Sequence, residues 1–273
     1  MGRLRTLQGL MRIASIDIGT NTILMLIADV QPDGSLRFVR DEHVIARLGR
    51  GVDEQKTILR ESFERVSQTL AEYKTIAKTE RCDKIFVCGT SALRDARNQK
   101  DFLEFIRKRL GLEIRVLSGK EEAELTYRGG VSGFFEEGKE KQFAVLDIGG
   151  GSTELTSGVN DQILNAQSLE IGSVRLTERF LKTSPPESGG LEAARDEIRR
   201  HVIPLPQLKA GAMVVGVAGT LTTLAAMDLA LPVYDRKKVD GHPLALATVQ
   251  SAFDLLKTKT LEEIRSIPQV LPQ

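Results

Sequence analysis

The 273-residue sequence has few of the side chains that form covalent cross-links or bind transition metals. Its two cysteines, Cys82 and Cys88, are too few for a disulfide framework or a thiolate metal cluster. The three histidines, His43, His201 and His242, do not favour a histidine-ligated transition metal. This composition indicates a protein of a reducing compartment, and we expect a cytoplasmic location.

The sequence also lacks an excess of charge of one sign, and it lacks long apolar runs. The 38 basic and 37 acidic residues leave a formal net charge of +1, so no overall field favours a nucleic-acid or membrane surface. No stretch approaches the roughly 18 apolar residues of a membrane span, and the first residues lack the apolar core of a signal peptide. The chain is long enough for two domains with separate cores, and any anion site must be local.

The most informative stretch runs from Val145 to Leu155 and reads VLDIGGGSTEL. Asp147 ends an apolar run, and Gly149, Gly150 and Gly151 follow almost at once. Glycines adopt backbone angles closed to other residues and bring bare N–H groups close to a ligand, which suits an anion such as phosphate. Asp147 would then hold a hydrated divalent cation against that phosphate. The alternative is an ordinary glycine-rich hairpin turn.

A second copy of this pattern lies 130 residues earlier, where Ile13 to Ile23 reads IASIDIGTNTI. Asp17 again ends an apolar run, and Gly19 and small hydroxylated residues follow. Two copies predict a duplicated architecture in which two similar loops face each other across one cleft.

The spacing of apolar residues predicts alternating strands and helices, which is typical of an α/β protein. We interpret Ile23–Ala28 as a strand buried on both faces, Met213–Val217 as a buried strand, and Arg236–Lys238 as a solvated loop. Glycines and charges after residue 125 place the boundary between the domains there, giving 1–124 and 125–273. The predicted strands are 12–18, 23–28, 36–44, 84–88, 113–117, 142–147, 154–159, 162–169 and 213–217, and the main predicted helices are 57–78, 100–110 and 191–202.

Three polar residues outside the glycine loops are further candidates. Arg94 follows the end of a predicted strand, where ligands bind in α/β sheets, and its planar guanidinium suits a phosphate. An ion pair with Asp95 is an equally good interpretation of Arg94. Ser118 and Glu121 have the spacing of a capping box at a helix start, so Glu121 has a structural role. Glu122 lies about 100° further around that helix and is available for chemistry.

Four motifs occur in order along the chain, and together they resemble the exopolyphosphatase and guanosine pentaphosphate phosphohydrolase (Ppx/GppA) family of the actin-like ATPase superfamily. They are DIGTNT from Asp17, GTSALRDA from Gly89, SGKEEA from Ser118 and DIGGGSTEL from Asp147. The resemblance implies a two-lobe actin-like (ribonuclease H-like) duplicated α/β fold with the active site in the interdomain cleft.

The resemblance also implies a role for each motif residue. Glu122 corresponds to the general base that activates water, and Arg94 to a contact with the phosphate chain. Asp147 and Glu154 look like the acidic residues for Mg²⁺, with Asp17 as the partner acid on the first lobe. The phosphate-binding set implied by the motifs is Asp17, Gly19, Thr20, Asn21, Thr22, Arg94, Gly149, Gly150, Gly151, Ser152 and Thr153.

The function implied is hydrolysis of the terminal phosphoanhydride of inorganic polyphosphate, with Mg²⁺ and with release of orthophosphate. The alternative substrate is guanosine pentaphosphate, which would connect the chain to the stringent response. A third possibility is an actin-like nucleotide-binding switch or assembly protein, which Ala218 between Gly216 and Gly219 weakly disfavours. We expect a homodimer. Members of the family usually continue with another strand and helices, whereas the given sequence stops at Gln273.

Overall fold

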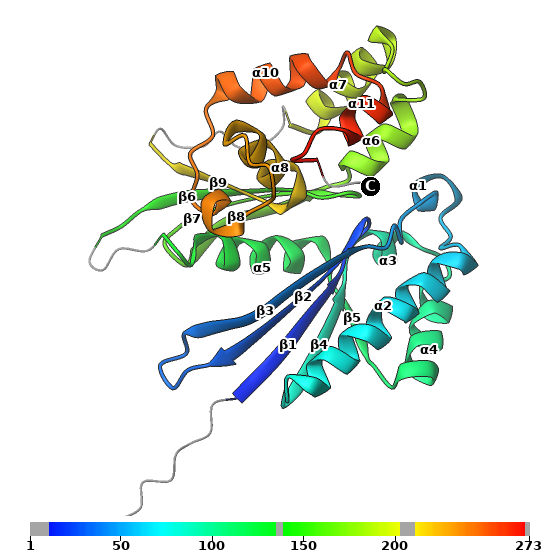
Figure 1. Cartoon of the computed structure of the whole chain (residues 1–273), viewed down its shortest axis with the longest axis vertical. Coiled ribbons are helices and arrows are strands. Elements are labelled where there is room, and N and C mark those ends of the chain that lie inside the picture. Colours follow the sequence, from blue (N-terminus) through cyan, green and yellow to red (C-terminus); the bar gives the residue numbers. More distant parts are fainter. Residues whose placement is uncertain (1–10, 135–138, 203–210, 271–273) are drawn as a thin grey trace, which may run out of the picture. The chain divides into compact units, whose positions relative to one another are not determined.

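A computed structural model describes residues 11–134, 139–202 and 211–270 (Figure 1). The predicted N-terminal extension, residues 1–10, lies outside the described residues. The chain folds as two compact units, Met1–Leu117 and Ser118–Gln273. The helix that carries Glu122 therefore belongs to the second unit, whereas the sequence placed the boundary after residue 124.

The first unit is built on a five-stranded sheet with the strand order β3-β2-β1-β4-β5. The first three strands form antiparallel hairpins, and β4 and β5 run parallel to β1. The strands are β1 (Met11–Ile18), β2 (Thr22–Val30), β3 (Leu36–Ile45), β4 (Lys84–Gly89) and β5 (Ile114–Val116). The helices are α1 (Val52–Gln55), α2 (Arg60–Thr79), α3 (Ser91–Asp95) and α4 (Gln99–Leu110).

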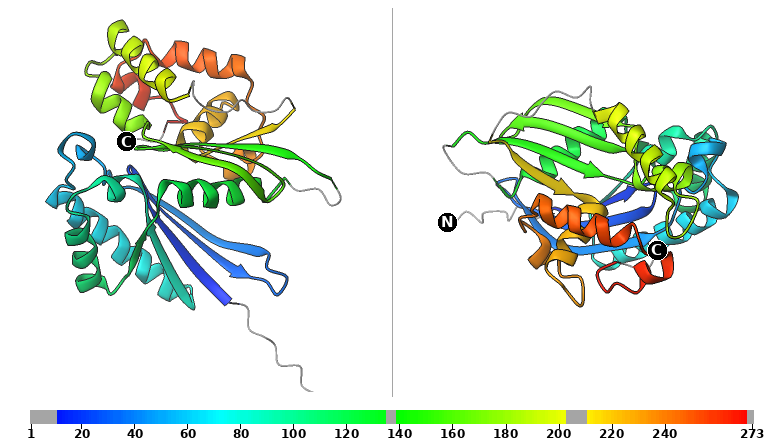
Figure 2. Two further views of the ribbon diagram at one scale, coloured as in Figure 1. Left: turned by 180° about the vertical axis from the view of Figure 1, so that it is seen from behind. Right: turned by 90° about the horizontal axis from the view of Figure 1, so that it is seen from above.

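The core of the first unit lies between this sheet and the helices α2 and α4 (Figures 1 and 2). The apolar stripe predicted for the long helix supplies Phe63, Val66 and Leu70 to that core. The expectation that Ile23–Ala28 is buried on both faces is wrong, because Leu24 is 45% exposed while Met25 is fully buried. Successive side chains point to opposite faces of a strand, and only one of these faces meets the helices.

The second unit contains a four-stranded sheet with the order β8-β7-β6-β9. Helix α5 covers one face of this sheet, and α8 lies against the other face (Figures 1 and 2). The strands are β6 (Gln142–Ile148), β7 (Thr153–Val159), β8 (Gln162–Leu169) and β9 (Met213–Val217). The helices are α5 (Gly119–Val131), α6 (Ser173–Phe180), α7 (Ser188–Val202), α8 (Ala218–Asp228), α9 (Arg236–Val239), α10 (Leu246–Leu256) and α11 (Leu261–Arg265).

Two expectations for the second unit need correction. Met213–Val217 is a strand, but it lies at the edge of the sheet and is not buried, since Val214 is 57% exposed. Arg236–Lys238 has exposed side chains as predicted, yet it begins the short helix α9. The Asp235 side chain accepts a hydrogen bond from the Lys237 backbone N–H at 3.0 Å and so starts this helix. No helix in the described ranges is both long and apolar enough to cross a membrane.

The two sheets repeat one plan, which confirms the predicted duplication. In each, three antiparallel strands are followed by a fourth strand parallel to the first. Asp17 on β1 and Asp147 on β6 occupy equivalent positions, with Cys88 and Val217 as their respective neighbours on the parallel strand. The pairing of the second and third strands is irregular at equivalent places too, at Ile27/Ala28 and at Ser157/Gly158.

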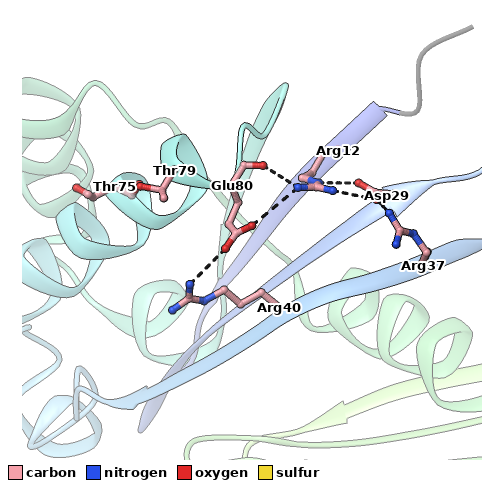
Figure 3. A network of polar contacts seen from close by, with 7 residues as sticks. All are labelled: Arg12, Asp29, Arg37, Arg40, Thr75, Thr79 and Glu80. Carbon is pink, nitrogen blue, oxygen red and sulfur yellow. Dashed lines mark hydrogen bonds and ion pairs between the residues drawn. The ribbon is translucent and has the colours of Figure 1, made fainter.

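An ion-pair network links β1 to its neighbours at the end of the first sheet opposite the Gly19 loop (Figure 3). Asp29 is 2% exposed, and it accepts hydrogen bonds from Arg12 Nε at 2.7 Å and from Arg37 Nη2 at 2.5 Å. Arg12 also donates to the Glu80 carbonyl at the end of α2, at 2.9 Å. The Arg12 and Arg37 guanidinium groups lower the pKa of Asp29, although burial opposes this.

We expect Asp29→Asn to lower the free energy of unfolding of the first unit, because both arginines lose their charged partner. A carboxyl whose pKa is depressed in the folded state stabilises the fold above its ordinary pKa, and this contribution disappears as the pH falls through the folded-state pKa. Thermal unfolding should therefore show a deficit for Asp29→Asn that is constant at neutral pH and shrinks below about pH 4. Glu42→Gln, at a more exposed ion pair with Arg40, is the control, and an equal loss there would contradict this account.

Candidate active site

The glycine loop of the second unit joins β6 to β7 and is flanked by two carboxylates. Asp147 on β6 pairs directly with Glu154 on β7, and Glu154 pairs with Ser168 on β8. Paired residues on neighbouring strands project from the same face of a sheet, so these three side chains form one row. Glu154 is only 2% exposed. In the first unit, the same row holds Asp17 but has Leu24 where Glu154 stands.

Helix α5 brings a third carboxylate to this face of the sheet. The predicted capping box is confirmed, since the Ser118 N–H donates to Glu121 Oε2 at 2.9 Å and the Glu121 N–H donates to Ser118 Oγ at 3.2 Å. Thr126 lies one turn after Glu122 on the same helix face, and its hydroxyl donates to Asp147 Oδ2 at 3.5 Å. The face of α5 that carries Glu122 is therefore the face that meets Asp147.

Burial and neighbouring negative charge raise the pKa values of Asp147 and Glu154. Burial first, and then the negative charge of Glu122, raise the pKa of Asp147 to about 6. The pKa of Glu154 is raised for the same two reasons, although the Ser168 hydroxyl donates to Glu154 Oε1 at 2.7 Å and favours the ionised form. Buried like charges are costly unless a proton or a cation joins them. The arrangement is thus suited to binding positive charge.

The carboxylates of Asp147 and Glu154 suit a Mg²⁺ ion that also keeps water and phosphate ligands. Among residues 11–134, 139–202 and 211–270, no group of three or more histidine, cysteine, aspartate or glutamate side chains is arranged to hold a metal ion. A protein-only metal cage is therefore not present in these ranges. Mg²⁺ usually keeps several waters and is bound by one or two carboxylates together with phosphate oxygens. Asp147 and Glu154 could supply the carboxylates of a site of that kind.

The peptide groups of the second glycine loop are oriented by helix α6. The carbonyls of Gly149 and Gly150 accept hydrogen bonds from the N–H groups of Ser173 and Val174, both at 2.9 Å. In a trans peptide the C=O and the following N–H point in opposite directions, so the N–H groups of Gly150 and Gly151 point away from α6. Within the described residues, no backbone carbonyl accepts from either N–H. Such a pair of donors is a concave anion site.

The first loop has a similar arrangement, shifted by one carbonyl along the loop. The carbonyls of Thr20 and Asn21 accept hydrogen bonds from the N–H groups of Gly49 and Arg47, both at 2.8 Å. The Gly19 N–H closes the turn by donating to the Thr22 carbonyl at 2.9 Å, and the Gly149 N–H does the same to the Ser152 carbonyl at 3.0 Å. The duplication therefore extends from the strand order to individual hydrogen bonds.

The expected reason for the first glycine of each loop needs correction. Neither Gly19 nor Gly149 has a left-handed φ, so special backbone angles do not explain them. A Cβ atom on Gly19 would lie 2.9 Å from the Thr22 carbonyl oxygen, and one on Gly149 would lie 3.1 Å from that of Ser152. Glycine is needed at both positions because the turn closes too tightly for a side chain.

Three other predicted site residues have structural contacts of their own. Asp17 lies on β1 with Cys88 Sγ 3.8 Å from its Oδ1. Arg94 on α3 donates from Nη1 to the Leu117 carbonyl at 3.0 Å, a contact that the sequence did not predict. The Thr153 hydroxyl donates to the Ile171 carbonyl at 2.7 Å. The roles of these residues in binding phosphate stay predictions, as do those of Thr20, Asn21, Thr22 and Ser152.

Several residues that shape the site were missed by the sequence analysis. Thr126 and Ser168 contact the carboxylates, and Gly172 contacts the second loop. A Cβ atom on Gly172 would lie 2.4 Å from the Gly150 carbonyl oxygen. Gly49 is as crowded against Thr20 in the first unit. A shared signal was available, since an aliphatic residue and a glycine follow the third strand of each unit, as Leu48-Gly49 and Ile171-Gly172.

Comparisons with known proteins agree with this architecture. The Ppx/GppA phosphatase family matches residues 26–270. Exopolyphosphatase 2 of Mycobacterium tuberculosis is 37% identical over 237 residues, which cover 83% of this chain and 73% of that protein. The bifunctional 3-dehydroquinate synthase/phosphatase of Fusobacterium nucleatum is 33% identical over 265 residues, covering 93% of this chain and 40% of that protein.

Solved structures show the same fold. The crystal structure of the Aquifex aeolicus member of the Ppx/GppA family superposes with a TM-score of 0.77 at 31% identity, over 96% of this chain and 84% of that one. An exopolyphosphatase-like protein superposes with a TM-score of 0.87 at 32% identity, over 96% of this chain and 82% of that one. The chain therefore belongs to the Ppx/GppA phosphatase family of phosphoanhydride hydrolases and has its two-lobe actin-like fold.

Proposed function

We propose that this chain hydrolyses the terminal phosphoanhydride bond of inorganic polyphosphate and releases orthophosphate. The observation that carries the proposal is the pair of Asp147 and Glu154 close to Glu122. The pair adjoins a loop whose Gly150 and Gly151 N–H groups point away from α6. Its relatives in Mycobacterium tuberculosis are named exopolyphosphatases, which supports the choice of substrate.

Phosphoanhydride hydrolysis needs few kinds of group, and the second unit has a candidate for each. The N–H groups of Gly150 and Gly151 would bind the oxygens of the phosphate that is cleaved. Glu122 would accept a proton from the attacking water, which makes the water a better nucleophile. Bound Mg²⁺ supplies positive charge against the phosphate oxygens, and Asp147 and Glu154 are the residues that would hold it. In the first unit, the loop at Gly19 and the Arg94 guanidinium are proposed as further phosphate contacts.

The proposal predicts a definite order of substrates. With Mg²⁺ present, the purified chain should release orthophosphate fastest from polyphosphate, more slowly from guanosine pentaphosphate and slowest from ATP. Initial rates at equal concentrations of chain ends measure this order. Each compound can then be tested as an inhibitor of the hydrolysis of the others. Guanosine pentaphosphate as the preferred substrate would favour the alternative phosphohydrolase. Tight binding of ATP without phosphate release would favour a nucleotide-binding switch and contradict the proposal.

Two adjacent carboxylates provide a matched test of the proposed base. Glu122→Gln keeps the shape of the side chain but removes the base, so we expect turnover of polyphosphate to fall by at least about 10²-fold. Glu121→Gln should retain activity and stability, because glutamine can also close the capping box with Ser118. Steady-state kinetics and thermal unfolding of both variants check this prediction.

An equal loss of activity in both variants would contradict the assignment of Glu122. So would a Glu122→Gln variant that retains most of the parent's turnover. A water bound to Mg²⁺ and held near Asp147 or Glu154 would then be the better candidate for the nucleophile.

The carboxylate row also predicts a conflict between stability and function. A carboxyl whose folded-state pKa is raised from 3.8 to about 6 destabilises the ionised folded chain, increasingly as the pH rises through that range. Asp147→Asn should therefore abolish hydrolysis yet stabilise the metal-free protein by about 1 to 3 kcal/mol at pH 8, with little gain at pH 4. Asp161→Asn, at an exposed turn, is the control.

Denaturant unfolding without divalent cations measures this difference. A metal-free Asp147→Asn variant that is less stable than the parent at pH 8 would show that Asp147 has a stabilising partner, and this would contradict the carboxylate repulsion.

A further inference from the structure

Arg175 is a buried charged residue that neither the sequence motifs nor the proposed chemistry uses. It lies in the first turn of α6 and is 5% exposed. Its Nε donates to the Gly151 carbonyl at 2.8 Å, and its Nη2 donates to Glu170 Oε2 at 2.9 Å. Burying a guanidinium costs free energy unless it is paired and hydrogen-bonded, and the two contacts of Arg175 offset that cost. Both contacts hold the cation against the segment next to the second glycine loop.

The Gly151 carbonyl completes a series along that loop. Three successive carbonyls, those of Gly149, Gly150 and Gly151, accept from Ser173 N–H, Val174 N–H and Arg175 Nε in turn. Each bond fixes one peptide plane, and the trans geometry aims the next N–H in the opposite direction. Arg175 therefore fixes the peptide between Gly151 and Ser152, and with it the direction of the Ser152 N–H.

The first unit provides a comparison for this contact. There, the carbonyl equivalent to that of Gly151 belongs to Asn21, and it accepts from the backbone N–H of Arg47. A backbone donor suffices in a loop that contains Thr20 and Asn21. The second loop has Gly150 and Gly151 at those positions, and two glycines have far more backbone freedom. A charge-assisted hydrogen bond from a buried guanidinium is stronger than a neutral one and limits that freedom.

We propose that Arg175 is a positioning residue, which orders the peptide after Gly151 so that the N–H group of Ser152 is set, next to that of Gly151, to receive a phosphate before it binds. Glu170 holds the guanidinium in place from the other side. This inference rests on the proposed function only in taking the loop to bind phosphate. Preorganised donors improve binding because the loop loses less conformational entropy when the anion arrives.

Amide NMR on the whole chain tests this inference at the atoms concerned. In Arg175→Lys, which keeps the charge but loses the planar fork, the Gly151 and Ser152 amide signals should shift or broaden without any ligand. The signals of Gly19 to Thr22 serve as the internal control and should stay unchanged. Inorganic tripolyphosphate should bind to Arg175→Lys about tenfold more weakly than to the parent. Both Ca²⁺ and Mg²⁺ are removed in this measurement to prevent turnover.

Two further variants keep the test decisive. Glu170→Ala changes a half-exposed side chain, so it should fold, and it should weaken tripolyphosphate binding in the same direction by about two- to threefold. Arg179→Lys alters an ion pair with Glu197 one turn further along α6 and should leave binding unchanged.

The outcomes separate this inference from the proposed function. Unchanged loop amides and tripolyphosphate affinity within twofold of the parent, in both Arg175→Lys and Glu170→Ala, would overturn the positioning role. Signals lost equally in both loops would overturn it as well, because Arg175 would then serve the fold as a whole. Tripolyphosphate binding at Gly151 and Ser152 that is weakened in Arg175→Lys, in a chain whose parent hydrolyses no polyphosphate, would support the positioning role and contradict the proposed function.

Discussion

Repulsion among three neighbouring carboxylates, of which Glu154 is buried, is the constraint on which the rest of the second unit depends. Asp147 and Glu154 face each other across β6 and β7, and Glu122 adds its charge from α5. The free energy of folding must come from elsewhere to hold them together. It comes in part from Tyr127 and Val131 on α5, which are fully buried against Phe143 and Val145 of β6. The core of this unit therefore supports the arrangement that its polar row disfavours.

The two sheets differ in this row although they share one plan. Asp17 and Asp147 are equivalent, but the strand position next to Asp17 holds Leu24 where the second unit has Glu154. Both glycine loops have their carbonyls engaged by the segment that follows the third strand. Both loops are thus built to present N–H groups, whereas the paired carboxylates occur only in the second unit. The loop geometry is therefore present in both units, whereas the proposed metal and base chemistry is placed in the second unit.

Much of this architecture could be predicted from the sequence because its signals are local. Alternating and three- to four-residue apolar spacings located the strands and the main helices, and the Ser118 and Glu121 spacing identified the capping box. The predictions failed where solvent exposure depends on neighbours that are distant in sequence, as for Leu24 and Val214. Gly172, Ser168 and Arg175 were missed for a related reason. Each acts on a motif about 15 to 25 residues away, through hydrogen bonds or close contacts that no local pattern encodes.

The central proposal is that Asp147 and Glu154, next to the negative charge of Glu122, bind a divalent cation in the second unit. Calorimetric titration of the metal-free chain with Mg²⁺, in buffers of different ionisation enthalpy, tests it most directly because it counts the protons released. With the pKa of Asp147 raised to about 6, part of its population is protonated at pH 6 and must lose the proton when a cation binds. The account predicts saturable binding with clear proton release at pH 6, and the loss of that release in Asp147→Asn. Binding that releases no protons at pH 6, or no binding with or without inorganic phosphate, would contradict it.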